Sequence, residues 1–254
     1  MNETINPSLN TGQEKINWLD KDKIDELLTA NNLAEYNLII LQETPSTNTY
    51  VLNDINKFKD KTVVMAEYQS CGRGRGNKVW LSKLAVDITV SFVYWLDLEV
   101  KYEVLPLVVA VAVNRLLKDC KIKTKIKWPN DIHLENGEKI CGILVESGIN
   151  QGKRFVVIGI GLDNVNNLER NYLLFSLIKN LDNVMSEFLV FGFSLIKQEW
   201  LDNCVHHKHQ VSVLRNNEIL SSGINVGISD SGALLVESDN HITEYNSANI
   251  SLRF

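Results

Sequence analysis

The sequence predicts an α+β protein with a mixed or antiparallel sheet, helices packed on that sheet, and a small C-terminal β-barrel. Apolar runs of strand length alternate with segments of helical spacing, and an asparagine–glycine turn at Asn136-Gly137 joins two of these runs. Closer to the C-terminus, short strand-like runs follow one another with turn residues between them. We therefore expect an N-terminal extension with a short helix (1–37), a main domain (38–205) and a barrel domain (206–254).

A helix, a strand and a second helix are expected at the start. Helical spacing follows Asp20, the expected N-cap, and residues 38–41 (LIIL) have the composition of a buried strand. The second helix begins at Ser46-Thr47-Asn48, because serine and threonine are favoured N-caps, and we expect it to continue to about Phe58.

The middle of the chain alternates helices with strands. A helix is expected at residues 102–119, and residues 105–117 within it form the most apolar run of the chain, which we expect to be buried. Residues 121–128 alternate lysines with mostly apolar side chains, as in a half-buried strand, and Pro129 stops that strand just after Lys127. Strand ends are common positions for functional residues. Two hairpins and two helices should follow, with turns at 135–138 and 150–152 and helices at 172–190 and 193–204.

The C-terminal residues predict the small barrel. Strands are expected at 211–214, 224–228, 233–236 and 250–252. Just before them, the run His206-His207-Lys208-His209 has two interpretations, a metal site or a surface hinge. We favour the hinge, because the histidines are nearly contiguous and no second ligand cluster accompanies them.

Composition limits the classes of function. The 254 residues are 44% hydrophobic and 22% charged, typical of a globular protein with one large core and a small second domain. A net charge of −5 argues against a general nucleic-acid binder, and no segment approaches the roughly 20 apolar residues of a membrane span. The four cysteines form no C-x-x-C pair, so we expect free thiols, with packing roles for Cys71 and Cys141. These features indicate a cytoplasmic protein.

A basic, glycine-rich loop is the clearest functional signal. Within residues 69–80, Arg73, Arg75 and Lys78 are interleaved with three glycines. Glycine lets backbone N–H groups approach a ligand closely, and arginine supplies paired donors, so this composition suits an anionic ligand. A solvated surface turn is the alternative. Strand-like runs on both sides favour a mobile basic loop held by a rigid sheet.

Four motifs carry a resemblance to the biotin protein ligases. They are, in order, Ser46-Thr47-Asn48, residues 69–80 (QSCGRGRGNKVW), residues 127–131 (KWPND) and residues 139–146 (KICGILVE). Their order and spacing are similar to those of the family, over roughly residues 38–254, and KWPND is the most specific. The resemblance implies a class II synthetase-like catalytic domain that binds biotin and ATP in residues 38–205, and an SH3-like barrel in 206–254.

The resemblance also implies ATP-dependent biotinylation. In this family the biotin carboxylate attacks the α-phosphate of ATP, and a lysine of a biotin carboxyl carrier protein then attacks the mixed anhydride. Cations must compensate two converging anions, so the implied cofactors are ATP and Mg²⁺. The implied catalytic residues are Lys127, Arg73 and Arg75. The implied biotin-binding residues are Ser46, Thr47, Gln69, Gly72, Arg73, Trp80 and Lys127. The implied nucleotide-binding residues are Arg75, Asn130, Asp131 and Asp163, with Lys139 a weaker candidate and no metal ligand assigned.

Two positions depart from the family pattern. Asn77 stands where many members have glycine, and Asp163 stands where asparagine is usual. An ionised aspartate accepts hydrogen bonds but cannot donate them, so two positions stay open for Asp163, against the adenine or pointing away. The residues before the first strand are too few for the DNA-binding module of some bacterial members, so we expect a monofunctional ligase that binds no DNA.

Other functions stay open at this point. Lipoate attachment uses a related fold and the same adenylate chemistry, although KWPND and the basic loop favour biotin. A biotin-sensing module would keep the pocket without turnover, and pyrophosphate release separates it from an enzyme. The sequence leaves open which carrier is modified and whether the protein forms a homodimer.

Overall fold

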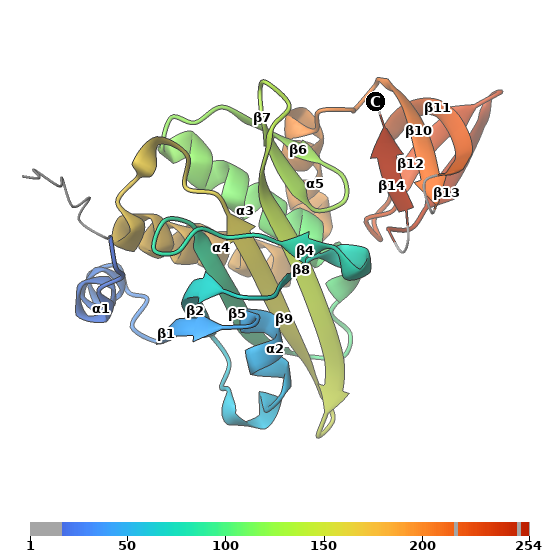
Figure 1. Ribbon diagram of the computed structural model, residues 1–254. Coiled ribbons are helices and arrows are strands. Elements are labelled where there is room, and N and C mark those ends of the chain that lie inside the picture. The colour runs from blue at the N-terminus through green and yellow to red at the C-terminus, as the bar shows by residue number, and fades with distance from the viewer. Residues whose placement is uncertain (1–16, 216–217, 248–249, 254) are drawn as a thin grey trace, which may run out of the picture.

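The computed structural model describes residues 17–215, 218–247 and 250–253 (Figure 1). Within them, a seven-stranded sheet with helices on one face precedes a five-stranded antiparallel sheet near the C-terminus. The predicted α+β class is confirmed. No helix in these ranges has the length and apolarity needed to cross a bilayer.

The large sheet is mixed, with strand order β1-β2-β5-β9-β8-β7-β6. β1 (Asn37–Thr44) runs parallel to β2 (Thr62–Gln69), and all other neighbours are antiparallel. The remaining strands are β5 (Ile88–Leu96), β6 (Thr124–Lys127), β7 (Asp131–Leu134), β8 (Lys139–Asn150) and β9 (Lys153–Leu162). β6 is shorter than predicted, but it ends at Lys127 as expected, and Lys121, Lys123 and Lys125 are exposed.

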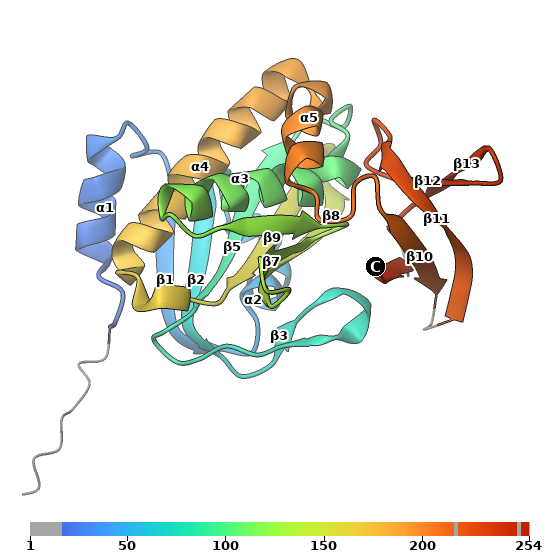
Figure 2. The same ribbon diagram turned by 90° about the horizontal axis from the view of Figure 1, so that it is seen from above.

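Helices cover one face of this sheet (Figure 2). They are α3 (Leu105–Asp119), α4 (Arg170–Phe191) and α5 (Phe193–Asn203), and α1 (Lys21–Ala30) packs beside α4. α3 is buried along most of its length, as its apolar run predicted, and the main apolar core lies between these helices and the sheet. Asp20 caps α1 by accepting a hydrogen bond from the backbone N–H of Lys23.

The other face carries α2 (Thr47–Leu52) and the basic loop (Figure 2). Ser46 is the N-cap of α2, as predicted, but the helix does not continue to Phe58. It ends at Leu52 before a short 3₁₀ turn, because asparagine and aspartate at 53 and 54 favour turns over a helix interior. The break lets Phe58 turn inward and join a small apolar cluster beneath α2.

The basic loop joins β2 to β5, as predicted. It contains a short hairpin of β3 (Gly72–Arg73) and β4 (Val79–Trp80), with a 3₁₀ turn between them. Two glycines are required here. A Cβ on Gly72 would lie 2.4 Å from the carbonyl oxygen of Trp80, and Gly76 has a φ of +60°.

Five strands form the C-terminal sheet in the order β13-β12-β11-β10-β14. They are β10 (Gln210–Arg215), β11 (Glu218–Ile228), β12 (Leu234–Ser238), β13 (His241–Tyr245) and β14 (Ile250–Arg253). The prediction missed β13, because almost all of its residues are exposed and no apolar alternation marks it. The asparagine pair at residues 216–217, whose composition predicts a turn between the first two expected strands, lies outside the described residues.

The expected surface position of His206 is wrong. Its side chain is fully buried, and its Nε2 accepts a hydrogen bond of 3.0 Å from the backbone N–H of Trp128. Burial, with a smaller effect of Lys127, lowers the pKa of His206 to about 3. The indole N–H of Trp128 donates to the carbonyl oxygen of Gly232, at 3.1 Å. These bonds fix the segment after β6 to the C-terminal part of the chain.

Candidate active site

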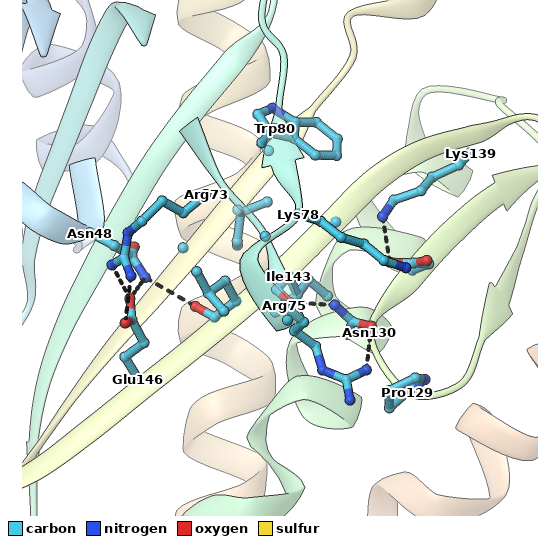
Figure 3. A pocket seen from close by; sticks show the side chains of 18 of the residues that line it. Asn48, Arg73, Arg75, Lys78, Trp80, Pro129, Asn130, Lys139, Ile143 and Glu146 are labelled. Atoms are coloured by element: carbon cyan, nitrogen blue, oxygen red, sulfur yellow. Dashed lines mark hydrogen bonds and ion pairs between the residues drawn. The ribbon is translucent and has the colours of Figure 1, made fainter. Parts of the chain in front are cut away.

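A pocket of about 930 Å³ opens on the face of the sheet that carries the basic loop (Figure 3). All four sequence motifs contribute to its lining, although more than 90 residues separate the first of them from the last. Three C-terminal residues, Ser247, Ile250 and Leu252, complete it. The pocket is therefore assembled from both parts of the chain.

The structure brings most of the predicted site residues together. Those that line the pocket are Ser46, Thr47, Gln69, Arg73, Arg75, Trp80, Lys127, Asn130 and Asp131, together with the weaker candidate Lys139. Gly72 and Asp163 are not in the lining. Gly72 instead permits the close approach of β3 to β4. Asp163 follows the end of β9, and its backbone N–H donates to the carbonyl oxygen of Ile140.

Arg75 connects the basic loop with both sides of the pocket. Its guanidinium donates to Oδ1 of Asn130 at 3.2 Å and to the carbonyl oxygen of Ser247. Asn130 is held in turn, because its amide donates to the carbonyl oxygen of Ile143 at 2.7 Å. The Arg75 side chain is partly buried, and this burial lowers its pKa.

Lys127 is a second partly desolvated cation. It is half-buried at the end of β6, in contrast to the exposed lysines earlier in that segment. Burial is the main cause of its lowered pKa, Lys139 and Lys78 lower it further, and Asp131 opposes them. Burial and the neighbouring lysines both disfavour the charged form of Lys127. An anion bound here would offset both effects by attracting the ammonium group.

Trp80 lies over a floor of glycines. A Cβ on Gly161 would lie 2.2 Å from the indole, and one on Gly142 would lie 3.0 Å from it. The ammonium of Lys139 is 5.5 Å from the centre of the Trp80 ring and forms an ion pair of 2.7 Å with Asp131. A flat surface beside an aromatic ring suits a planar ligand group.

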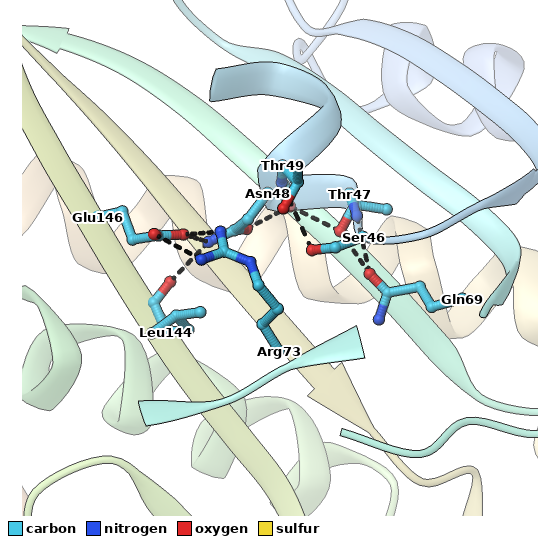
Figure 4. A network of polar contacts seen from close by, with 9 residues as sticks. Ser46, Thr47, Asn48, Thr49, Gln69, Arg73, Leu144 and Glu146 are labelled. Carbon is cyan, nitrogen blue, oxygen red and sulfur yellow. Dashed lines mark hydrogen bonds and ion pairs between the residues drawn. The ribbon is translucent and has the colours of Figure 1, made fainter. Parts of the chain in front are cut away.

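Arg73 has a partner that the sequence did not reveal. Its guanidinium forms a bidentate pair with Glu146, with N–O distances of 3.1 and 2.6 Å, and Glu146 also accepts from the amide of Asn48 at 2.9 Å (Figure 4). Strand alternation offers a signal for this carboxylate, because Gly142, Leu144 and Glu146 fall on one face of β8 and all three line the pocket.

Thiols and metal-ligand clusters play little part in this pocket. Cys71 is exposed, so its expected packing role is wrong, whereas Cys141 is buried and its pKa is raised by that burial.

Among the described residues, no group of three or more histidine, cysteine, aspartate or glutamate side chains is arranged to hold a metal ion. Asp131 and Glu146 supply the lining carboxylates, and each is paired with a cation.

Comparison with known proteins agrees with this geometry. Residues 40–163 match the model of the Biotin/lipoate A/B protein ligase family, and residues 209–253 match the Biotin protein ligase C terminal domain. The bifunctional ligase/repressor BirA of Salmonella typhimurium is 31% identical over 265 residues, covering 94% of this chain and 80% of the relative. Biotin–protein ligase 2 of Arabidopsis thaliana is 29% identical, covering 78% of this chain and 68% of the relative.

A solved structure is similar over most of this chain. The biotin protein ligase from Aquifex aeolicus in complex with biotin and ATP has a TM-score of 0.72 and 25% sequence identity, covering 85% of this chain and 98% of that one. The family models, the relatives and the fold thus agree with the motifs that line the pocket. The chain belongs to the biotin protein ligase family.

Proposed function

We propose that the protein is a biotin protein ligase, which activates biotin with ATP to biotinyl-5′-AMP and transfers the biotinyl group to a lysine of a biotin carboxyl carrier protein. The observation that carries this proposal is the convergence of Arg73, Arg75 and Lys127 in one pocket with the polar wall around Thr47 and Gln69. Such a pocket offers cations for two anionic substrates and neutral polar groups for a small uncharged ring.

Biotin would occupy the side of the pocket near α2. There the hydroxyls of Ser46 and Thr47 and the amide of Gln69 can meet the polar ureido ring, with Arg73 nearby. Gly72 supports this wall by keeping the loop close to Trp80. Lys127 would lie toward the biotin carboxylate.

The nucleotide would occupy the opposite side. Arg75, Asn130 and Asp131 lie together there, and Trp80 offers its ring above the glycine floor. Asp163 would contribute only from outside the lining. The carbonyl oxygen of Ser247 holds Arg75 toward this side, so the C-terminal residues take part in ordering the loop.

The reaction needs charge compensation more than a protein nucleophile. A carboxylate oxygen of biotin forms a bond to the α-phosphorus of ATP, and the bond to the β-phosphate oxygen breaks, releasing pyrophosphate. Lys127 and Arg75 are partly desolvated, so their attraction for the converging anions is stronger than in water. The carrier lysine, as a neutral amine, then attacks the biotinyl carbonyl carbon, AMP leaves, and the amine proton passes to solvent.

The pocket fits a Mg²⁺ ion that arrives with the nucleotide. Magnesium sites commonly combine one or two carboxylates with substrate phosphates and water, and Asp131 with the neighbouring Asn130 offers oxygen donors of this kind. When bound, the ion would add positive charge beside the triphosphate. Asp131 would then exchange its contact with Lys139 for the metal, and Lys139 would be free to meet a phosphate.

Pyrophosphate release tests the proposal and separates it from its alternatives. The purified protein should release pyrophosphate from MgATP when biotin is present, and much less when lipoate replaces biotin. Higher release with lipoate would assign lipoate activation instead. Binding of biotin without any release would assign a sensor. Arg73→Lys, which keeps the charge, serves as a comparison for loss of the bidentate contact.

A further inference from the structure

A chain of hydrogen bonds follows one wall of the pocket from Glu146 to Gln69 (Figure 4). The amide nitrogen of Asn48 lies 2.9 Å from Glu146, and Oδ1 of Asn48 lies 2.5 Å from the hydroxyl of Ser91. That hydroxyl is 2.7 Å from Oγ1 of Thr47, whose backbone N–H donates to Oε1 of Gln69 at 2.8 Å. We call these five residues the polar chain.

The direction of the first two bonds follows from the groups that meet there. Nδ2 of Asn48 faces the Glu146 carboxylate and the carbonyl oxygen of Leu144, both of which can only accept hydrogen bonds. The amide oxygen of Asn48 must therefore face Ser91. Ser91 has one proton and is fully buried, so this proton goes to the Asn48 oxygen, which has none to offer.

The next bond is fixed in the same way. Since the Ser91 proton is committed, two hydroxyl oxygens only 2.7 Å apart need the Thr47 proton between them. The competing acceptor, Oε1 of Gln69, is farther from the Thr47 hydroxyl, at 3.1 Å, and it already accepts from the backbone N–H of Thr47. The side-chain protons of Asn48, Ser91 and Thr47 thus all point toward Glu146, whereas the backbone N–H of Thr47 points toward Gln69.

At the Gln69 end of the polar chain, two groups with fixed hydrogen-bonding roles therefore face the pocket. The Thr47 hydroxyl has lone pairs but no free proton, so it can only accept. Because Oε1 of Gln69 is held by Thr47, its amide nitrogen remains as a donor. A ring that carries an N–H group next to a carbonyl group satisfies both. On the proposed function, on which this inference rests, the ureido ring of biotin supplies that pair, whereas the dithiolane ring of lipoate supplies neither.

We infer that Glu146 is a positioning residue that acts through Asn48 and Ser91 to hold Thr47 as a hydrogen-bond acceptor, and thereby selects the ureido ring. Arg73 supports this role, because its bidentate pair with Glu146 keeps both carboxylate oxygens as acceptors. Glutamine at position 146 could either donate or accept. Asn48 could then reverse its amide at the loss of only the longer hydrogen bond to Leu144, at 3.3 Å, and the proton of Thr47 could point into the pocket.

Calorimetric titration of three variants with biotin tests the inference. Glu146→Gln removes the fixed end of the chain, and Ser91→Ala cuts the chain without touching Arg73. Each should raise the Kd for biotin by about tenfold, since one well-placed hydrogen bond to the ligand is lost. Thr89→Val is the matched control, because it removes another buried hydroxyl of β5, which donates to Ala66 outside the chain. Its Kd should match the wild type.

Further readouts separate positioning from damage to the fold. In Ser91→Ala, which leaves the Arg73–Glu146 pair in place, the affinity for ATP and the kcat for pyrophosphate release at saturating biotin should change less than twofold. The effect should therefore fall on the KM for biotin. Desthiobiotin, which keeps the ureido ring, should be weakened by the same factor as biotin. In the Ser91→Ala background, adding Glu146→Gln should have little further effect, because the connection is already cut.

The possible results are distinct. A wild-type protein that does not bind biotin would overturn the proposed function. Wild-type binding with unchanged affinity in both Glu146→Gln and Ser91→Ala would overturn the inference alone. A loss in Glu146→Gln without one in Ser91→Ala would mean that Glu146 acts only through Arg73, which also overturns it. If Glu146→Gln does not fold, the Kd for biotin of Ser91→Ala, compared with that of Thr89→Val, still tests the inference.

Discussion

Arg75 in the basic loop donates a hydrogen bond to the backbone carbonyl oxygen of Ser247, 172 residues later in the chain. The same guanidinium reaches Asn130 beside β7. The loop is thus connected both to the strand end of the main sheet and to the C-terminal residues. A segment held on two sides can cover a ligand while it remains able to open.

We predict that Arg75→Ala leaves the fold intact and speeds dissociation of the biotinyl adenylate by tenfold or more. A hydrogen bond to a charged group contributes about 1.5–3 kcal/mol, and this side chain contacts the pocket instead of the core. Dissociation after rapid dilution of the preformed complex measures the effect. Lys83→Ala is the control, since Lys83 is an exposed cation that follows the same loop. Equal rates in all three proteins would remove Arg75 from the ligand contacts.

Lys127→Met should slow adenylate formation more than it weakens ATP binding. The side chain keeps its length but loses a charge that is placed where two anions converge, so its contribution should be largest in the transition state. Single-turnover pyrophosphate release at saturating substrates measures this step. Lys125→Met is the control, because Lys125 is an exposed lysine two positions earlier in β6. Wild-type release by Lys127→Met would show that this charge takes no part in the chemistry.

The elements that sequence could predict are those with a local signal. The apolar run at 105–117 became α3, the glycine at position 137 adopts a φ of +87° in its turn, and the caps at Asp20 and Ser46 are observed. The strand β13 could not be predicted, because its side chains are exposed and carry no alternation. The local sequence does not distinguish such a strand from a loop, because the strand forms by pairing with β12.

The candidate site shows the same limit. Motif residues such as Lys127 and Arg75 could be named from the sequence, but their partners could not. Glu146 lies 73 residues from Arg73 and 98 from Asn48, so only the packing of β8 against the loop and α2 brings them together. The burial of His206 could not be predicted for the same reason. This histidine lies in a polar run of the sequence, but its side chain is buried and accepts a hydrogen bond from a distant backbone N–H.

Arg170→Met should destabilise the protein by about 3–5 kcal/mol, because it leaves the carboxylate of Glu67 buried without its partner. The two side chains form an ion pair of 2.6 Å with exposures of 0% and 1%. Arg170 also donates to the carbonyl oxygens of Asn17 and Asp87. Urea denaturation measures the change. The double variant Glu67→Gln/Arg170→Met should lose less than the sum of the single variants, and full additivity would contradict the coupling.

Asp163→Asn should stabilise the protein at neutral pH and not at pH 4. Burial, aided by Asp87, raises the pKa of Asp163 from 3.8 to about 6. The folded state therefore binds this proton more tightly than the unfolded state, and the resulting stability is complete below the unfolded pKa and lost as pH rises through about 6. Asparagine avoids that loss. We expect a gain of about 1 kcal/mol at pH 7.5, reduced by the partial exposure of the group.

Paired thermal denaturation of wild type and Asp163→Asn across pH 4 to 8 checks this sign. A constant difference over the range would contradict the shifted pKa. The ATP affinity of the same variant tests the sequence-based expectation that this carboxylate reaches the adenine. Its position outside the pocket lining leads us to expect equal affinities.

Intact mass of a carrier domain tests the central claim most directly. A biotin carboxyl carrier domain, incubated with the purified protein, biotin and MgATP, should gain the mass of one biotinyl group. The same domain with its acceptor lysine replaced by arginine should gain none, and neither domain should change when ATP is omitted. An unmodified wild-type carrier, from a protein that is folded and binds biotin, would contradict the proposal that this pocket joins biotin to a protein lysine.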